Sequence, residues 1–555
     1  MTSKRYLVVG GVAGGAACAA RLRRLDEKVE IVLFERGPDI SFANCGLPYY
    51  LGGVIRERQH LLVAGPARFR DWLNVEVRAR HEVRRIDRAA RTIEVRNLQT
   101  GADSTERYDA LVLSPGAQPV RPPLPGIDLA GVFTLRNLED ADRILAWLQE
   151  RRPDRAVVVG GGYIGLEMVE NLRRRGIAVT LLEAAPQVMS SMDPEMVAPI
   201  HAELRRQGVD LRLNRGVAGF ARGEDGQLEV LATGGERFAA GLAVVAVGVK
   251  PDIALARDAG LEIGALGGIR VDERMRTSDP AIWAVGDAVE VRDVVTGQWC
   301  LIALAGPAAR QARVAADAIC GRSSTFRGGQ GTAVVGVFGL TAAITGANEK
   351  RLRAAGVPYE KSYLHAPHHA GYYPGAEMMT IKLLFAPDSG RILGAQAVGG
   401  TGVDKRIDVL AMAIQKQATV FDLEEAELCY APQYGSAKDP VNMAGFVAAN
   451  IVRGDVEVAH WDEWFARRPD QNQGPLVLDV RTAAEASQGA VPGSVNIPLG
   501  ELRARLGELP RDREIWVHCG VGQRSYYATR VLRQNGFQVR NLSGGMKSFE
   551  AAQLQ

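Results

Sequence analysis

The chain is poor in cysteine, nearly balanced in charge and without a long apolar run. Its six cysteines among 555 residues form no C-x-x-C pair and no zinc-ligand spacing, which excludes a disulfide scaffold and favours a reducing, cytoplasmic location. Lys and Arg number 67 against 64 Asp and Glu, a net charge of +3, so we expect neither nucleic acid nor a membrane as a partner. No apolar stretch reaches the roughly 18 residues that a membrane-spanning helix needs.

Glycine, in contrast, is plentiful. The chain has 62 glycines and 46% apolar residues, and its length predicts three or four domains. Four glycines interrupt the apolar stretch near the start, at Gly10, Gly11, Gly14 and Gly15. A strand that enters a phosphate-binding turn explains them better than a signal peptide does.

Two segments predict βαβ units of the dinucleotide-binding kind. In residues 5–35 a buried strand leads into the glycine turn, a helix through Leu25 and a second strand closed by Glu35. Residues 155–183 repeat this plan with a full G-x-G-x-x-G pattern and close on Glu183. The first copy departs from the pattern, because Val12 stands where the second glycine is usual. We expect strands near 111–113, 244–247 and 282–285 to return to the same two sheets.

The two turns predict two nucleotide cofactors. Glycines let the backbone approach a pyrophosphate, and the acidic residue that ends the second strand accepts hydrogen bonds from a ribose. Gly286-Asp287 is similar to the pair with which flavoproteins hold the ribityl chain of FAD. FAD together with NADH or NADPH is therefore expected, with hydride transfer from nicotinamide to flavin. NADH is favoured, because Glu183 would repel a 2′-phosphate and Ala184 and Ala185 bring no arginine to neutralise it.

The most specific stretch of the front half is Ser41-Phe42-Ala43-Asn44-Cys45-Gly46-Leu47-Pro48. It matches the signature S-F-x-N-C-G-x-P, and in it the chain resembles the single-cysteine pyridine nucleotide-disulfide reductases, in particular the coenzyme A-disulfide and coenzyme A-persulfide reductases. The resemblance spans residues 1 to about 450 and includes Ala13-Gly14-Gly15, Tyr372-Tyr373-Pro374-Gly375 and Tyr430-Ala431-Pro432.

The resemblance implies a role for Cys45. In that family the cysteine lies beside the flavin and forms a mixed disulfide with coenzyme A, and a lone thiolate does need an external thiol to complete a redox cycle. Cys18, Cys300 and Cys320 are expected to be inert. Related oxidases and peroxidases carry a His in the first glycine turn, and this chain has none there, which points away from peroxide or oxygen as the acceptor.

The resemblance also implies contacts at numbered positions. Coenzyme A would meet Arg21 and Arg24, unless these form a solvated helix face, while Ser41 and Asn44 flank the cysteine. Tyr372 or Tyr373, and Tyr430, would reach the active site from the second subunit of a homodimer, or pack in the interior or at the interface. His365, His368 and His369 are expected to be loop histidines without a metal. The expected cofactor contacts are Gly10, Gly11, Ala13, Gly15, Glu35, Arg36, Val83, Ser114, Gly116 and Asp287, then Gly160, Gly162, Ile164, Gly165, Glu183 and Gly248.

The last hundred residues carry a different pattern. The ordered series Leu478-Asp479-Val480-Arg481, Glu485, Gly493 to Pro498 and Trp516 to Ser525 resembles a single rhodanese domain over about 460–550. Cys519 would follow a strand and open a loop into a helix at 526–534, where backbone amides hold an anion and Arg524 adds a fixed charge. The C-x4-R spacing favours sulfane sulfur over the phosphate of C-x5-R enzymes. Gly520 departs from the Arg that many rhodaneses carry, which favours a bulkier persulfide donor over thiosulfate.

The sequence thus predicts an α/β protein of four domains: an FAD-binding domain at 1–118 and 252–325, an NAD(P)H-binding domain at 119–251, an α+β dimerisation domain at 326–452 and a rhodanese α/β domain at 458–555. A polar stretch at 467–474 precedes the main α/β pattern of the last domain. We expect a reductase of coenzyme A disulfide, coenzyme A persulfide or polysulfide, with coenzyme A relaying sulfur between Cys519 and Cys45. The alternatives are an NADH oxidase that uses a Cys45 sulfenic acid, and a sulfurtransferase with a redox-sensing flavin domain.

Overall fold

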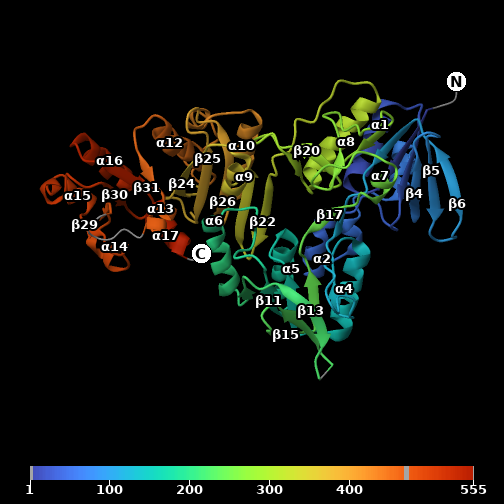
Figure 1. Ribbon diagram of the computed structural model, residues 1–555, viewed down its shortest axis with the longest axis horizontal. Helices are drawn as coiled ribbons and strands as arrows, with labels where there is room; N and C mark the ends of the chain where they lie inside the picture. The colour runs from blue at the N-terminus through green and yellow to red at the C-terminus, as the bar shows by residue number, and fades with distance from the viewer. Residues whose placement is uncertain (1–3, 225, 468–473, 554–555) are drawn as a thin grey trace. The chain divides into compact units, whose positions relative to one another are not determined.

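The computed structural model describes residues 4–224, 226–467 and 474–553 (Figure 1). They form two compact units, one running to Val188 and including Gly208–Gly331, the other combining Met189–Gln207 with the chain from Thr332 onward. The polar stretch expected at 467–474 lies largely outside the described residues. Across the described ranges, no helix is at once long and apolar enough to cross a bilayer.

The first unit contains the two parallel sheets that the sequence predicts. One has the order β19-β7-β1-β2-β3, and its register sets Val8 opposite Leu33 and Val112. Its central strands β1 and β7 are apolar runs with buried interiors, as in sheets covered on both faces, and the expected return of the strands near 111 and 282 is confirmed. Its strands and its two long helices, which pack on each other, are β1 (Arg5–Val9), β2 (Glu30–Glu35), β3 (Glu76–Ala79), β7 (Ala110–Leu113), β19 (Ile282–Ala284), α1 (Ala13–Leu25) and α8 (Ala305–Ile319).

The second parallel sheet has the order β12-β11-β10-β16-β9. Val157 of its central strand lies opposite Thr180 and Ala243, so the strand near 244 returns to this sheet as predicted. Asn137 begins the first helix with a capping box, accepting from the amide of Asp140. The elements are β9 (Val132–Phe133), α4 (Leu138–Arg151), β10 (Arg155–Val159), α5 (Tyr163–Arg174), β11 (Ala178–Leu182), β12 (Asp210–Arg212) and β16 (Leu242–Val245).

Smaller elements complete the first unit. Its short helices are η1 (Asn44–Gly46), α2 (Leu47–Leu51), η2 (Arg58–Leu61), α3 (Pro66–Leu73) and α7 (Ala254–Asp258). Small sheets are formed by β4 (His81–Asp87), β5 (Thr92–Asn97) and β6 (Asp103–Arg107); by β13 (Val217–Arg222), β14 (Leu228–Ala232) and β15 (Arg237–Ala240); by β8 (Ala117–Pro119) and β17 (Val249–Pro251); and by β18 (Ile269–Arg270), β20 (Val289–Arg292) and β21 (Trp299–Leu301).

An antiparallel sheet of order β22-β23-β26-β25-β24 opens the second unit. Its helices α10 and α12 pack on it, α10 on β23 and β26 and α12 on β24 and β25. The helix α6 (Pro194–Arg206) also packs on this sheet and belongs to this unit, although the sequence assigned it to the NAD(P)H-binding domain. The other elements are β22 (Ala333–Val337), β23 (Leu340–Gly346), α9 (Glu349–Ala355), β24 (Glu360–Pro367), β25 (Met378–Phe385), β26 (Ile392–Gly399), α10 (Val403–Gln415), α11 (Val420–Glu424) and α12 (Pro440–Val452).

The second unit also holds a parallel sheet of order β27-β31-β30-β28-β29. One face packs Leu478, Val517 and Leu532, and the other packs Trp461, Trp516 and Phe549. Its elements are β27 (Val458–Ala459), α13 (Trp461–Arg467), β28 (Leu476–Asp479), α14 (Ala483–Ser487), β29 (Val495–Asn496), α15 (Leu499–Leu502), η3 (Leu506–Glu508), β30 (Ile515–His518), α16 (Gln523–Gln534), β31 (Val539–Leu542) and α17 (Gly545–Gln553).

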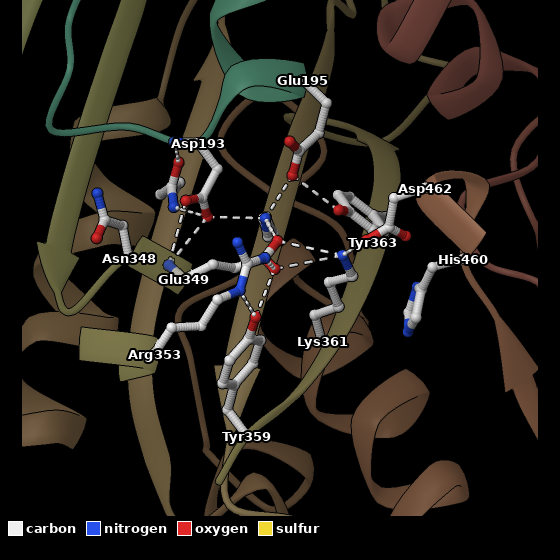
Figure 2. A network of polar contacts seen from close by, with 12 residues as sticks. Asp193, Glu195, Asn348, Glu349, Arg353, Tyr359, Lys361, Tyr363, His460 and Asp462 are labelled. Atoms are coloured by element: carbon white, nitrogen blue, oxygen red, sulfur yellow. Dashed lines mark hydrogen bonds and ion pairs between the residues drawn. The ribbon is translucent and has the colours of Figure 1, made fainter. Parts of the chain in front are cut away.

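A buried polar network joins the antiparallel sheet of the second unit to the helices α6, α9 and α13 (Figure 2). The ammonium of Lys382, 0% exposed, contacts the carboxylates of Asp193, Glu195 and Glu349. These three carboxylates lie close enough together to hold a metal ion, but the lysine already supplies the cation. Lys361 extends the network by pairing with Glu349 at 3.2 Å and with Asp462 of α13 at 3.0 Å.

Candidate active sites

A cavity of about 400 Å³ lies where the first parallel sheet meets its glycine turn. The turn is tight: a Cβ added at Gly10 would lie 2.1 Å from the carbonyl oxygen of Ser114, and one at Gly14 would lie 2.7 Å from the Ser114 hydroxyl. Both oxygens of Glu35 accept from backbone amides, those of Gly11 and Gly37, at 2.8 Å. Of the expected flavin contacts, Gly11 and Gly15 are not among the lining residues, and the cavity is lined by Gly10, Ala13, Glu35, Arg36, Val83, Ser114, Gly116 and Asp287.

Cys45 lies in the short helix η1, directly after Asn44, which lines the cavity. Its side chain is exposed, and its sulfur lies 3.8 Å from the Asn44 side-chain oxygen. Ser41 leads into this segment with φ +47°, a conformation that non-glycine residues seldom adopt and that tends to occur at functional sites. The Ser41 amide donates to the carbonyl of Gly11 at 2.8 Å, so the cysteine segment is tied to the glycine turn.

The surroundings of Cys45 hold its thiol protonated. Burial of the sulfur, then the negative charges of Glu167 and Asp287, raise the pKa of Cys45, while Arg136 lowers it. Asp287 and Arg136 line the cavity, as does Asn44, the residue directly before Cys45. Sequence reasoning missed Glu167, which lies on α5 and accepts from the Tyr49 hydroxyl at 3.2 Å. The signal was an acidic side chain in the first, largely apolar part of the helix.

The second glycine turn repeats the first. Gly160 has φ +101°, and a Cβ at Gly165 would lie 1.9 Å from its carbonyl oxygen. The Glu183 carboxylate accepts from the amides of Gly161 at 2.6 Å and Ala185 at 2.8 Å. A Cβ at Gly162 would meet no atom within 4 Å, which leaves the backbone open to a ligand. Ile164 and Gly248 are also exposed.

The expected coenzyme A arginines differ in their surroundings. Arg21 donates two hydrogen bonds to Asp317 of α8, at 2.8 and 3.0 Å, and that ion pair is largely buried. A phosphate would have to compete with Asp317 for this guanidinium, and Arg21 stays a predicted coenzyme A contact. Arg24 is exposed and stays a predicted phosphate contact.

The structure brings two of the expected tyrosines together. The hydroxyls of Tyr372 and Tyr430 lie 2.9 Å apart, and both side chains are exposed, as is Tyr373. This hydrogen bond raises the pKa of Tyr372. The pair is thus available to a second subunit.

Of the three histidines that the sequence places in a loop, His368 and His369 do follow the end of β24, but His365 does not lie in a loop. His365 lies on β24 and is buried, with its ring nitrogens 2.8 Å from Thr380 Oγ1 and 3.0 Å from Ser548 Oγ. Burial lowers the pKa of His365 to about 3. His368 and His369 are also buried and lie with their ring centroids 4.2 Å apart.

Cys519 lies in the loop between β30 and α16, and its side chain is fully buried. The backbone amide of Gly522, with φ +99°, donates toward the sulfur at 3.2 Å. The loop is braced from behind, because the amides of Met546 and Lys547 donate to the carbonyls of Cys519 and Gly520. The helix begins at Gln523, three residues before the predicted start.

Arg524 does not stand alone over this loop. Its guanidinium donates to both oxygens of Glu485, at 2.7 and 2.6 Å. The fixed charge predicted for Arg524 is thus present beside the loop, where it is paired with Glu485 and also interacts with Cys519. Glu485 was noted in the sequence only as a member of the series.

Comparisons with known proteins agree with this architecture. Residues 4–312 match the pyridine nucleotide-disulphide oxidoreductase family, residues 332–439 its dimerisation domain and residues 462–552 the rhodanese-like domain. A coenzyme A disulfide reductase of Staphylococcus epidermidis is 37% identical over 445 residues, 80% of this chain and 99% of that protein.

Solved structures resemble the chain over a greater length. Reduced CoADR-RHD from Bacillus anthracis is 49% identical with a TM-score of 0.96, covering 99% of this chain and 98% of its own. A NAD-dependent persulfide reductase from A. fulgidus is 37% identical with a TM-score of 0.90, covering 98% and 100%. A water-forming NADH oxidase from Lactobacillus brevis is 28% identical with a TM-score of 0.78, covering 82% and 100%. The chain belongs to the pyridine nucleotide-disulphide oxidoreductase family and carries a rhodanese-like domain after its dimerisation domain.

Proposed function

We propose that this chain uses NADH and FAD to reduce coenzyme A disulfide, coenzyme A persulfide or polysulfide, while its rhodanese-like domain carries sulfane sulfur. The observation that carries the proposal is one exposed thiol, Cys45, beside the dinucleotide cavity and under the charges of Asp287 and Arg136 that line it. The relatives named above, a coenzyme A disulfide reductase and a NAD-dependent persulfide reductase, support it.

The two glycine turns fit the two cofactors. Gly10, Gly14 and Ser114 would cradle the FAD pyrophosphate with Glu35 at its ribose, and Asp287 would meet the ribityl chain. Gly160, Gly162 and Glu183 would hold NADH in the same manner. When bound, FAD takes a hydride from NADH and supplies two electrons to a disulfide.

The chain's own chemistry centres on Cys45. Its thiolate would attack one sulfur of coenzyme A disulfide, so that one coenzyme A leaves as a thiolate and a mixed disulfide remains on Cys45. Two electrons and two protons then release the second coenzyme A and restore the thiol, and one NADH is consumed. Tyr372 and Tyr430 of the partner subunit would supply a proton to the leaving thiolate.

NADH should be preferred over NADPH. The carboxylate of Glu183 would repel a 2′-phosphate, and the nearby arginines cannot easily offset it, because Arg212 is paired with Asp210 and Arg215 with Glu236, each at 2.7 Å. The kcat/KM values for the two cofactors, measured on the same disulfide, test this. A preference for NADPH would mean that one of these arginines leaves its partner.

The decisive test is Cys45→Ser. The variant should retain bound FAD, seen in its absorption spectrum, but lose NADH-dependent cleavage of coenzyme A disulfide by at least about a hundredfold, because serine cannot form the mixed disulfide. Cys300→Ser, at a half-buried cysteine, is the matched control and should keep wild-type turnover. Turnover retained in Cys45→Ser, or NADH oxidation that tracks oxygen consumption rather than thiol release, would overturn the proposal.

A further inference from the structure

We infer that Glu485 sets the donor specificity of the Cys519 loop: by neutralising Arg524, it selects an organic persulfide over dianionic thiosulfate. The inference rests on the sulfurtransferase part of the proposed function and adds a residue and a substrate class to it. It depends on the bidentate contact between these two side chains, which the sequence did not predict.

The contact is a full charge pair. Both guanidinium nitrogens of Arg524 donate to Glu485, at 2.7 and 2.6 Å, in the parallel geometry that makes such pairs strong and directional. The side chains are 35% and 42% exposed, so the pair stands at the mouth of the loop rather than in the core. The hydrogen bonds from Arg524 lower the pKa of Glu485 to about 2, and the carboxylate is therefore ionised throughout the neutral range.

Glu485 is held in place by neighbouring residues. It completes a capping box with Thr482, whose hydroxyl donates to the same carboxylate at 2.9 Å. Arg481, buried against Asp479, donates to the carbonyls of Glu485 and Gly489 at 3.3 and 2.6 Å. The Asp-Val-Arg sequence thus fixes the segment that presents Glu485 to the loop.

Gly520 and Lys547 are two other positions near Cys519 where a positive charge could replace the paired charge of Arg524. Gly520, next to the cysteine, carries no side chain, and a Cβ there would meet only Arg524, at 3.6 Å. The backbone amide of Lys547 donates a hydrogen bond to the carbonyl of Gly520 in the loop. Its ammonium is one of the causes that lower the pKa of His365. An anion at Cys519 therefore meets the amide of Gly522 and the guanidinium of Arg524, which interacts with the sulfur while it is paired with Glu485.

The two donors differ in the charge that they bring. With thiosulfate, the Cys519 thiolate attacks the outer sulfur, the S–S bond breaks and sulfite departs with the bonding pair, so three negative charges share the loop. With a persulfide R–S–SH, the same attack leaves R–S⁻ and a Cys519 persulfide, and at most two charges share it. A loop whose arginine is already paired favours the second reaction, because like charges in a partly buried site repel strongly.

Loading of Cys519 tests the inference without NADH turnover. The full-length flavoprotein is mixed with thiosulfate or with glutathione persulfide, and the sulfur added to the Cys519 peptide is followed by mass spectrometry. Glu485→Gln should raise the ratio of thiosulfate to persulfide loading rates about tenfold. Glutamine still suits a capping box, so the fold should hold. Glu501→Gln, which removes another exposed carboxylate paired with an arginine, is the control and should leave the ratio unchanged.

A second variant keeps the test valid if Glu485→Gln does not fold. Gly520→Arg adds an unpaired cation where the structure has room and should raise the same ratio. An unchanged ratio in either folded variant, or faster thiosulfate than persulfide loading in the wild type, would overturn the inference. Failure of NADH-dependent reduction would instead count against the proposed function alone.

Discussion

Glu167 controls how much of the Cys45 thiol is ionised. Its negative charge is one of the causes that raise the pKa of Cys45, so its removal should lower that pKa and increase the thiolate at neutral pH. In Glu167→Gln, the midpoint of the pH dependence of Cys45 alkylation by iodoacetamide should move to lower pH. Glu170→Gln, on the same helix but paired with Arg174, should leave it near the wild-type value. A shift to higher pH would mean that Glu167 instead supports the thiolate.

Individual residues were predictable where the chemistry is local in sequence. Cys45, Cys519 and the turn glycines sit in short motifs whose spacing is dictated by the ligand. The ion-pair partners of the charged site residues could not be predicted. The pairing of Arg21 with Asp317, for example, spans 296 positions and depends on how α1 and α8 pack. Arg524 with Glu485 spans only 39, yet no spacing rule links two separate helices.

Strand β25 carries Lys382, and we expect the stability of the second unit to depend on this one side chain. The ammonium is surrounded by three carboxylates and fully buried, and it keeps the pKa of Glu195 and Glu349 below their usual range. Lys382→Met should lower stability by about 3–5 kcal/mol, since it leaves buried carboxylates without their counterion. Urea unfolding of the second unit, followed by tryptophan fluorescence, measures this.

Lys350→Met makes the same change at an exposed position on α9 and should alter stability by no more than about 0.5 kcal/mol. If Lys382→Met matched it, the ammonium would not be the counterion that holds the three carboxylates together.

At the scale of elements, the sequence predicted the strands and the first helix well, because apolar runs and glycine turns mark both. It assigned α6 to the NAD(P)H-binding domain, whereas α6 packs on the antiparallel sheet of the second unit. The amphipathic pattern of residues 194–206 shows that one face is buried, but not which sheet buries it. The amide of Asp193, just before that helix, donates to Gln396 on β26 at 2.7 Å, and this contact draws α6 to the antiparallel sheet.

For the molecule as a whole, the two cysteines should separate two activities. Cys45 and Cys519 lie in different compact units, and reduction of coenzyme A disulfide needs only the first. Cys519→Ser should therefore keep at least about half of that activity, but lose sulfur transfer to cyanide, because serine cannot hold a sulfane sulfur. Steady-state assays of both reactions measure the split. Equal loss of both would mean that the two cysteines serve one active site.

The different surroundings of the Cys45 and Cys519 thiols also affect how easily hydrogen peroxide can damage them. Overoxidation of a cysteine to the sulfinic and sulfonic acids requires a sulfur that is both ionised and within reach of the oxidant. Cys45 is within reach, but its raised pKa keeps most of it protonated. Cys519 is enclosed, with no exposed surface. Each sulfur therefore fails at least one of the two conditions, and we expect irreversible damage to begin only when turnover ionises Cys45 or a donor opens the loop around Cys519.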